Sequence, residues 1–274
     1  YDFEGSVMAT ILDLLSYNTH FQSFYLNMVG NEAFLSTAVK RDSVVARAKQ
    51  IGYVPRTASC GSATLFIEMQ NSAGLSFIDI PQGTIFNASA AGQTFVFRTM
   101  DARRVFRNSD GKYTISDLDI VEGKSFTHTF SINEDKIKSG VVIPNANADS
   151  TRLKVYVRDN TTSSNFEKYE LFDDVTNQTQ DSNVYYISEV EGGLLNVYFG
   201  DGVISKQLTL GGEVKVEYVV SSGPAANNIG AFTLVSPIPN SDFTTIEVVS
   251  PVTGGALPET IDSIKFRAPK SYES

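Results

Sequence analysis

The sequence contains no tryptophan, one cysteine and only two histidines. A single cysteine, Cys60, excludes an intrachain disulfide, and we expect it to be a small buried apolar residue. His20 and His128 lie far apart, and neither has a companion at the spacing of metal ligands. The Gly-x-Ser-x-Gly elbow of hydrolases and the complete phosphate-binding loop are also missing. We therefore predict no catalytic residue, no metal site, no cofactor and no enzyme activity.

The chain is also poor in positive charge and in long apolar runs. It has 22 basic and 31 acidic residues, which gives a net charge of -9. Such a chain repels a phosphate backbone, so we expect no nucleic-acid partner. No run approaches the roughly 18 apolar residues of a membrane span, so we expect no membrane partner. Because the chain begins at Tyr1 and not at methionine, we expect it to be a fragment of a longer protein.

A wide apolar surface marks the beginning of the chain. Two neighbouring rows recur at helical spacing, one of Val7, Ile11, Leu14, Phe21, Phe24 and Met28 and one of Met8, Leu12 and Leu15. We expect Gly30 and Asn31 to interrupt this helix. Apolar side chains over so wide an arc must be covered on more than one side. Two explanations stay open, which are packing on the rest of the chain and a helix bundle shared with other chains.

The remaining pattern predicts one more helix, many strands and a last helix. Asp42 is expected to cap the second helix, Gly52 to end it in the left-handed conformation, and Pro55 to forbid its continuation. Short alternating runs with glycine turns follow. Near the end we expect a helix with Pro258 in its first turn. The fold class is thus α+β, with an N-terminal helical region, mainly antiparallel β-sandwich-like modules and a short C-terminal helix.

The stretch Tyr198–Leu208 resembles the start of a dinucleotide-binding loop because it contains Gly200-Asp201-Gly202. A true fingerprint needs a third small residue and then a helix, whereas here the segment after Ser205 alternates like a strand. We interpret Gly200, Asp201 and Gly202 as a structural turn. Asn145, Asn147 and Asp149 similarly resemble the start of a calcium loop, but the required Gly and Glu are absent, so we expect a polar loop.

Stretches at the front, middle and end of the chain together point to a family. The stretches are Glu32–Leu35, Arg41–Val45 and Ile51–Pro55; Tyr198–Gly202 followed by Gly223 and Ala226–Asn228; and Ser250–Gly255, Pro258–Thr260 and Phe266–Pro269. The first set resembles the N-terminal helical region of the baseplate wedge protein of T-even-type contractile-tail bacteriophages (myoviruses). The other two resemble the order of motifs in the baseplate J-like family.

The resemblance implies a structural subunit of the virion without catalytic residues. It implies helices that bundle with neighbouring subunits, two copies in each wedge, and β domains that contact other baseplate wedge proteins. It further implies a tail-baseplate location, assembly in the bacterial host cytoplasm, a ring of wedges around the central hub and a rearrangement on contraction. Intermolecular contacts are then expected among Leu12, Leu15, Phe21, Phe24 and Tyr25, and Gly254 and Gly255 are expected to form a structural turn.

The same resemblance suggests a division of the chain. We expect a helical region at 1–55, a β domain at 56–132 and 206–250, an inserted β module at 133–205, and at 251–274 a junction to a C-terminal part that is missing here.

Two other function classes stay open. A receptor- or glycan-binding tail module would present aromatic faces such as Tyr185 or Tyr186. A cell-wall hydrolase would need a buried cluster of acids or a metal.

Overall fold

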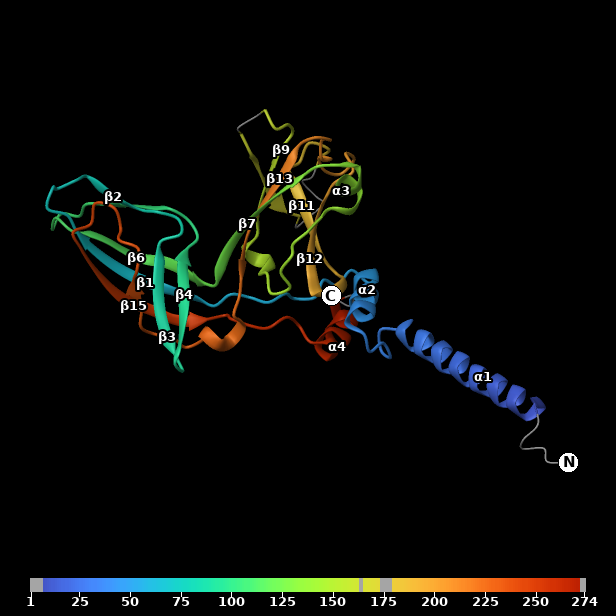
Figure 1. Ribbon diagram of the computed structural model, residues 1–274. Coiled ribbons are helices and arrows are strands. Elements are labelled where there is room, and N and C mark those ends of the chain that lie inside the picture. Colours follow the sequence, from blue (N-terminus) through green and yellow to red (C-terminus); the bar gives the residue numbers. More distant parts are fainter. Residues whose placement is uncertain (1–6, 163–164, 173–178, 272–274) are drawn as a thin grey trace. The chain divides into compact units, whose positions relative to one another are not determined.

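The computed structural model describes residues 7–162, 165–172 and 179–271 (Figure 1). It divides into two compact units. The helical unit comprises Tyr1–Pro55, Glu191–Gly193 and Glu259–Ser274, and the β unit comprises Arg56–Val190 and Leu194–Pro258. An N-terminal helical segment, mostly antiparallel sheets and a short C-terminal helix are all present, so the predicted α+β fold class is confirmed.

The helical unit contains three α-helices. These are α1 (Val7–Glu32), α2 (Arg41–Gln50) and α4 (Ile261–Ser271). Contrary to the prediction, Gly30 and Asn31 do not interrupt α1, because Gly30 keeps a negative φ and lowers helix stability by only about 1 kcal/mol. The prediction for Gly52 is confirmed, since its φ is +79° just after α2.

Two predictions about the starts of helices are wrong. Lys40 precedes the first turn of α2, and Asp42 lies inside that turn, where its charge favours the helix dipole. No side chain caps α2, and the Glu32 carboxylate instead accepts the N–H groups of Val39 and Lys40, just before the helix, at 2.9 and 3.2 Å. At α4 the Thr260 hydroxyl accepts the N–H of Ser263, so the helix begins after Pro258 and not with it.

Helices α2 and α4 pack against each other through small apolar side chains. The buried cluster consists of Ala38, Val44, Val45, Ala48, Ile264 and Ala268, flanked by Leu35, Tyr53 and Ile261. Alanine at the contact lets two helices approach closely, and each buried valine or isoleucine stabilises the unit by about 1.5 kcal/mol or more. The two ends of the chain therefore share one small core.

The first large sheet of the β unit has six antiparallel strands in the order β14-β3-β4-β6-β1-β15. Its strands are β1 (Ser62–Gln70), β3 (Ile85–Ala90), β4 (Gln93–Thr99), β6 (Tyr113–Glu122), β14 (Thr233–Leu234) and β15 (Phe243–Thr253). A two-stranded sheet of β2 (Phe77–Ile80) and β5 (Arg103–Phe106) accompanies it. In β1 every second side chain, from Ala63 to Met69, is buried, which is the period of a strand with one inner face.

The second large sheet has seven strands in the order β7-β13-β9-β10-β11-β12-β8. They are β7 (Lys124–Ser131), β8 (Val141–Val142), β9 (Lys154–Arg158), β10 (Glu167–Leu171), β11 (Val184–Val190), β12 (Leu194–Phe199) and β13 (Glu213–Val220). Within the described residues, the strand pairings of this sheet are antiparallel except that of β10 with β11. The predicted module at 133–205 covers only part of this sheet, because β7 and β13 belong to the sheet but lie outside that range. The predicted domain division as a whole stays a prediction.

The short helical segments belong to the loops between these strands. They are α3 (Glu134–Ser139), η1 (Ser150–Arg152), η3 (Glu191–Gly193) and η4 (Gly223–Ala226). The Asn133 side chain caps α3 by accepting the N–H of Lys136 at 2.9 Å. The Asp149 side chain caps η1 in the same way through the N–H of Thr151. Short polar side chains thus fix α3 and η1, whereas η3 and η4 have no side-chain cap.

The chain passes from the six-stranded to the seven-stranded sheet at Gly123, between β6 and β7. Gly123 has a φ of +125°, and a Cβ atom there would lie 2.5 Å from the carbonyl oxygen of Val220. The tripeptide Gly123-Lys124-Ser125 matches the end of a phosphate-binding motif, but β7 follows it where that motif requires a helix. Its glycine therefore serves a close backbone approach and not a nucleotide.

We expect Gly123→Ala to destabilise the protein by about 3 kcal/mol or more, because strain at positive φ adds to a backbone clash. Gly92→Ala is the matched control, since Gly92 has a φ of +78° with open space around its Cβ position. The control retains only the conformational cost of about 1 kcal/mol. Urea unfolding of both variants measures the difference, and equal losses would contradict the close approach at Gly123.

Candidate functional site

A buried carboxylate organises the helical unit. Glu259 is almost inaccessible to solvent, and the Tyr53 hydroxyl lies 2.9 and 2.8 Å from its two carboxylate oxygens. The Ser263 hydroxyl donates a further hydrogen bond of 2.6 Å, and the Arg267 guanidinium lies 3.8 Å away. A buried charge is tolerated when hydrogen bonds and an opposite charge compensate it. Glu259 meets both conditions.

These contacts join segments from opposite ends of the chain. Tyr53 follows α2, whereas Glu259 directly precedes α4, and 206 positions separate them. Arg41 at the start of α2 also donates a hydrogen bond to the backbone carbonyl of Glu259. Four of the stretches that carry the family resemblance, at the front and at the end of the chain, therefore meet at one residue, Glu259. Motif matching identified these stretches, but nothing in their spacing showed that they are in contact.

We expect Tyr53→Phe to lower the free energy of unfolding by about 2 kcal/mol, since it removes a donor from a buried charge. Tyr17→Phe on α1 is the matched control. Tyr17 is exposed, so removing its hydroxyl group should leave the free energy of unfolding nearly unchanged. Chemical denaturation, followed by circular dichroism, compares the two. A loss no larger for Tyr53→Phe than for Tyr17→Phe would show that the Glu259 cluster contributes no stability.

A second polar contact fixes the segment before α4. The side-chain amide of Asn227 donates to the carbonyl oxygen of Gly255 at 2.8 Å and accepts its N–H at 3.0 Å. A Cβ atom on Gly255 would lie 2.5 Å from the carbonyl oxygen of Gly223. The neighbouring Gly254 has a φ of +87°, which favours glycine. The Asn227 side-chain amide therefore holds the Gly254-Gly255 segment, which was expected to form a turn, through two hydrogen bonds. The close packing at Gly255 is possible only because this residue has no side chain.

The loop from Asn145 to Asp149, which resembles the start of a calcium loop, lies in the β unit, and its side chains form hydrogen bonds with other protein groups. Asp149 is buried and accepts hydrogen bonds from the N–H of Cys60 at 2.8 Å and from Thr151 at 2.9 and 2.6 Å. Asn145 instead donates to the hydroxyl of Tyr218 at 2.6 Å. Asp149 and Asn145 therefore bond to different partners. In the part of the chain that the structure describes, no group of three or more His, Cys, Asp or Glu side chains is arranged to hold a metal ion.

Cys60 is buried, as the sequence predicts. Burial raises the pKa of its thiol well above the ordinary value, and the adjacent Asp149 carboxylate raises it further. A thiol with a raised pKa carries little thiolate and is a poor nucleophile. The residue therefore serves packing.

The Gly200-Asp201-Gly202 stretch forms a tight exposed loop. The Asp201 carboxylate accepts the N–H of Val203 at 3.0 Å, and the N–H of Gly202 donates to the carbonyl of Ser205 at 3.0 Å. A Cβ atom on Gly200 would overlap the Ser205 side chain. The Asp201 oxygen thus closes an Asx turn.

Helix α1 carries the predicted interface residues. Leu12, Leu15, Phe21, Phe24 and Tyr25 all lie on it, with exposed fractions between 37% and 58%. None of its described side chains is buried. Tyr17, Phe21 and Tyr25 form a row in which successive ring centroids lie 4.5 and 6.3 Å apart. Among the helices of the described residues, none is long and apolar enough to cross a membrane.

The aromatic residues considered for glycan binding lie in the seven-stranded sheet. Tyr185 is buried, so it cannot present a face to a sugar, and that part of the alternative is wrong. Tyr186 is partly exposed, but its ring stacks on Tyr198 at 5.2 Å and packs against Phe172 at 4.7 Å. His128 likewise stacks on Tyr218 at 5.8 Å, while His20 lies on exposed α1. The rings of Tyr186 and His128 thus each pack against a neighbouring ring.

Comparisons with known proteins agree with these motifs. Residues 1–53 match the family model for the helical domain of gp6-like baseplate wedge proteins. Over 97% of its length the chain is 27% identical to the baseplate wedge protein gp6 of Enterobacteria phage T4. The predicted resemblance is confirmed. The chain spans 43% of the length of that relative. The six-fold symmetrised cryo-EM structure of the anti-feeding prophage (AFP) baseplate aligns with a TM-score of 0.31 and 14% identity, covering 99% of this chain and 49% of that one.

Proposed function

We propose that this chain is part of a structural subunit of a phage tail baseplate wedge and that it works by assembly, without catalysis. The similarity to a baseplate wedge protein over 97% of the chain supports this proposal. The proposed partners are other baseplate wedge proteins and a second copy of the chain. In this proposal the wedges join in a ring around the central hub, and the subunit transmits the rearrangement that accompanies contraction.

The observation that carries the proposal is the exposure of α1. A surface helix normally turns one apolar stripe to the core of its own chain, whereas α1 buries no described side chain there. Between Val7 and Glu32 its only charged residues are Asp13 and Glu32. Burying one leucine or phenylalanine contributes roughly 1.5–3 kcal/mol. A few such anchors in a bundle with other chains are sufficient for a permanent interface.

The connection after α1 supports the transmission of movement within the helical unit. The Glu32 carboxylate at the end of α1 binds the two N–H groups that precede α2. The Ser43 hydroxyl and the N–H of Val39 hold the pKa of Glu32 below its ordinary value, so the charged form is favoured in the folded state. The stabilisation by this contact is present above the unfolded-state pKa and is lost as the pH falls through the lowered folded-state value. We propose that a displacement of α1 reaches α2 through this contact.

The receptor- or glycan-binding alternative has less support. Sugar sites expose aromatic faces. Of the two tyrosines considered, one is buried and the other is stacked. A hydrolase would require converging acids, but the carboxylates of Glu259 and Asp149 are saturated by protein donors.

The bundle is tested by the double variant Phe21→Ala/Phe24→Ala. Alanine preserves helicity, so the change removes apolar anchors without disturbing α1. We expect the dissociation constant of the complex, formed alone or with co-expressed wedge proteins, to rise roughly 100-fold or more. Light scattering during gel filtration measures the mass of each complex across a dilution series.

The matched control is Phe243→Ala, because Phe243 is about as exposed as Phe24 but lies on β15. It should leave the mass of the complex unchanged. Circular dichroism of the double variant should retain the helical signal of the parent chain. A chain that stays monomeric with every wedge partner, or a complex that the double variant does not weaken, would contradict the bundle.

A further inference from the structure

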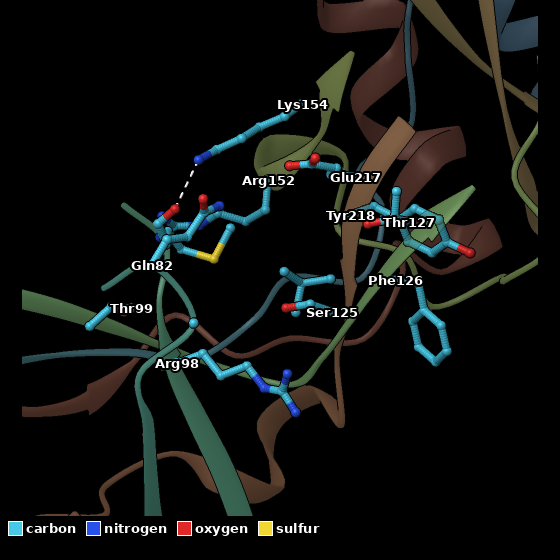
Figure 2. Close-up of a pocket in the computed structure, with 13 residues that line it drawn as sticks. Gln82, Arg98, Thr99, Ser125, Phe126, Thr127, Arg152, Lys154, Glu217 and Tyr218 are labelled. Carbon is cyan, nitrogen blue, oxygen red and sulfur yellow. Dashed lines mark hydrogen bonds between the residues drawn. The ribbon is translucent and has the colours of Figure 1, made fainter. Parts of the chain in front are cut away.

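A cavity of about 270 Å³ lies in the β unit between elements of its two large sheets. Arg98 of β4 contributes from the six-stranded sheet, whereas Ser125 of β7, Lys154 of β9 and Glu217 of β13 contribute from the seven-stranded sheet. Arg152, at the end of η1, completes the charged lining. Figure 2 shows Arg98 and Lys154 on either side of Ser125. The volume exceeds the share of one liquid water molecule, about 30 Å³, several-fold.

Two of the charged groups in this cavity are compensated by the protein. The Lys154 ammonium group donates to the Asp101 carboxylate at 2.7 Å and to the carbonyl oxygen of Met100 at 2.9 Å, and the dashed line in Figure 2 marks the second of these bonds. Glu217 forms an ion pair of 3.0 Å with Lys215. These groups therefore leave no strong charge for a ligand.

The two arginines are different. Within the described part of the chain, neither Arg98 nor Arg152 has a side-chain hydrogen bond or an ion pair. The Nε atom of Arg98 is moreover buried and without an acceptor. A buried donor left unpaired costs about 1–3 kcal/mol, and more when it is charged, so such donors in native proteins point to an absent acceptor. In a chain with a net charge of -9, two uncompensated guanidinium groups at one cavity call for a specific reason.

We propose that this cavity binds an oxyanion and that Arg98 and Arg152 are its ligands. The guanidinium group is always charged and presents its N–H donors in a planar fork that matches carboxylate, sulfate and phosphate oxygens. The Ser125 and Thr127 side chains, which also line the cavity, add hydroxyl groups suited to the same oxygens. The oxyanion is either a free inorganic ion or a carboxylate on an acidic peptide segment. This inference does not rest on the proposed function, because the binding can be measured on the chain alone.

Isothermal titration calorimetry of the chain at constant low ionic strength tests the proposal. The probes are sodium sulfate and a glutamate-rich peptide. The variants are Arg98→Gln and Arg152→Gln, and Arg103→Gln is the matched control because Arg103 is exposed on β5, outside the cavity. We expect each cavity substitution to weaken binding roughly tenfold or more, since it removes a charge-assisted hydrogen bond. The control should bind like the parent chain.

Binding of sulfate that depends on both arginines supports a free inorganic ion, and binding of the peptide alone supports a carboxylate segment. Sulfate also stabilises proteins by exclusion from their surface, so only the difference from Arg103→Gln counts as site binding. Arg152→Gln keeps the test valid if Arg98→Gln fails to fold. The proposal is overturned if the parent chain binds neither probe, or if both cavity variants bind as well as the control.

Discussion

The helical unit depends on keeping one buried carboxylate satisfied. An unpaired charge in a protein interior costs several kcal/mol, so Glu259 can be buried only where donors surround it. Those donors come from Tyr53, which follows α2, and from Ser263 on α4. The carboxylate therefore requires segments from both ends of the chain to fold together. Helices α2 and α4 thus bury their apolar side chains against each other, whereas no described side chain of α1 is buried.

Local signals predicted much of the fold because short-range physics determines them. The helical spacing of the first residues, the left-handed Gly52 and the alternation in β1 each reflect a constraint within a few positions. The errors concern the starts of two helices. Glu32 provides the acceptor before α2, and Thr260 starts α4, so the expected roles of Asp42 and Pro258 were wrong.

The polar contacts could not be predicted, because their partners are remote in the sequence. The bond from Cys60 to Asp149 spans 89 positions, and that from Tyr53 to Glu259 spans 206. A carboxylate in a polar loop looks solvated when only its neighbours are known. The family resemblance marked the stretches that contain Tyr53, Asn227 and Glu259, but not their contacts. In contrast, the apolar surface of α1 could be predicted because it depends only on the order of residues within one segment.

The chain thus separates two kinds of interaction. Inside each unit, directional hydrogen bonds to buried carboxylates and to glycine backbones fix a single arrangement, since few other geometries satisfy them. On α1 the exposed surface is mainly apolar, and apolar burial is non-directional. Burial of apolar surface stabilises a bundle formed by such a helix, but the shapes of the side chains must define the register of the helices. The row of tilted rings of Tyr17, Phe21 and Tyr25 can supply that shape, because aromatic rings are large, rigid and restricted in their packing geometry.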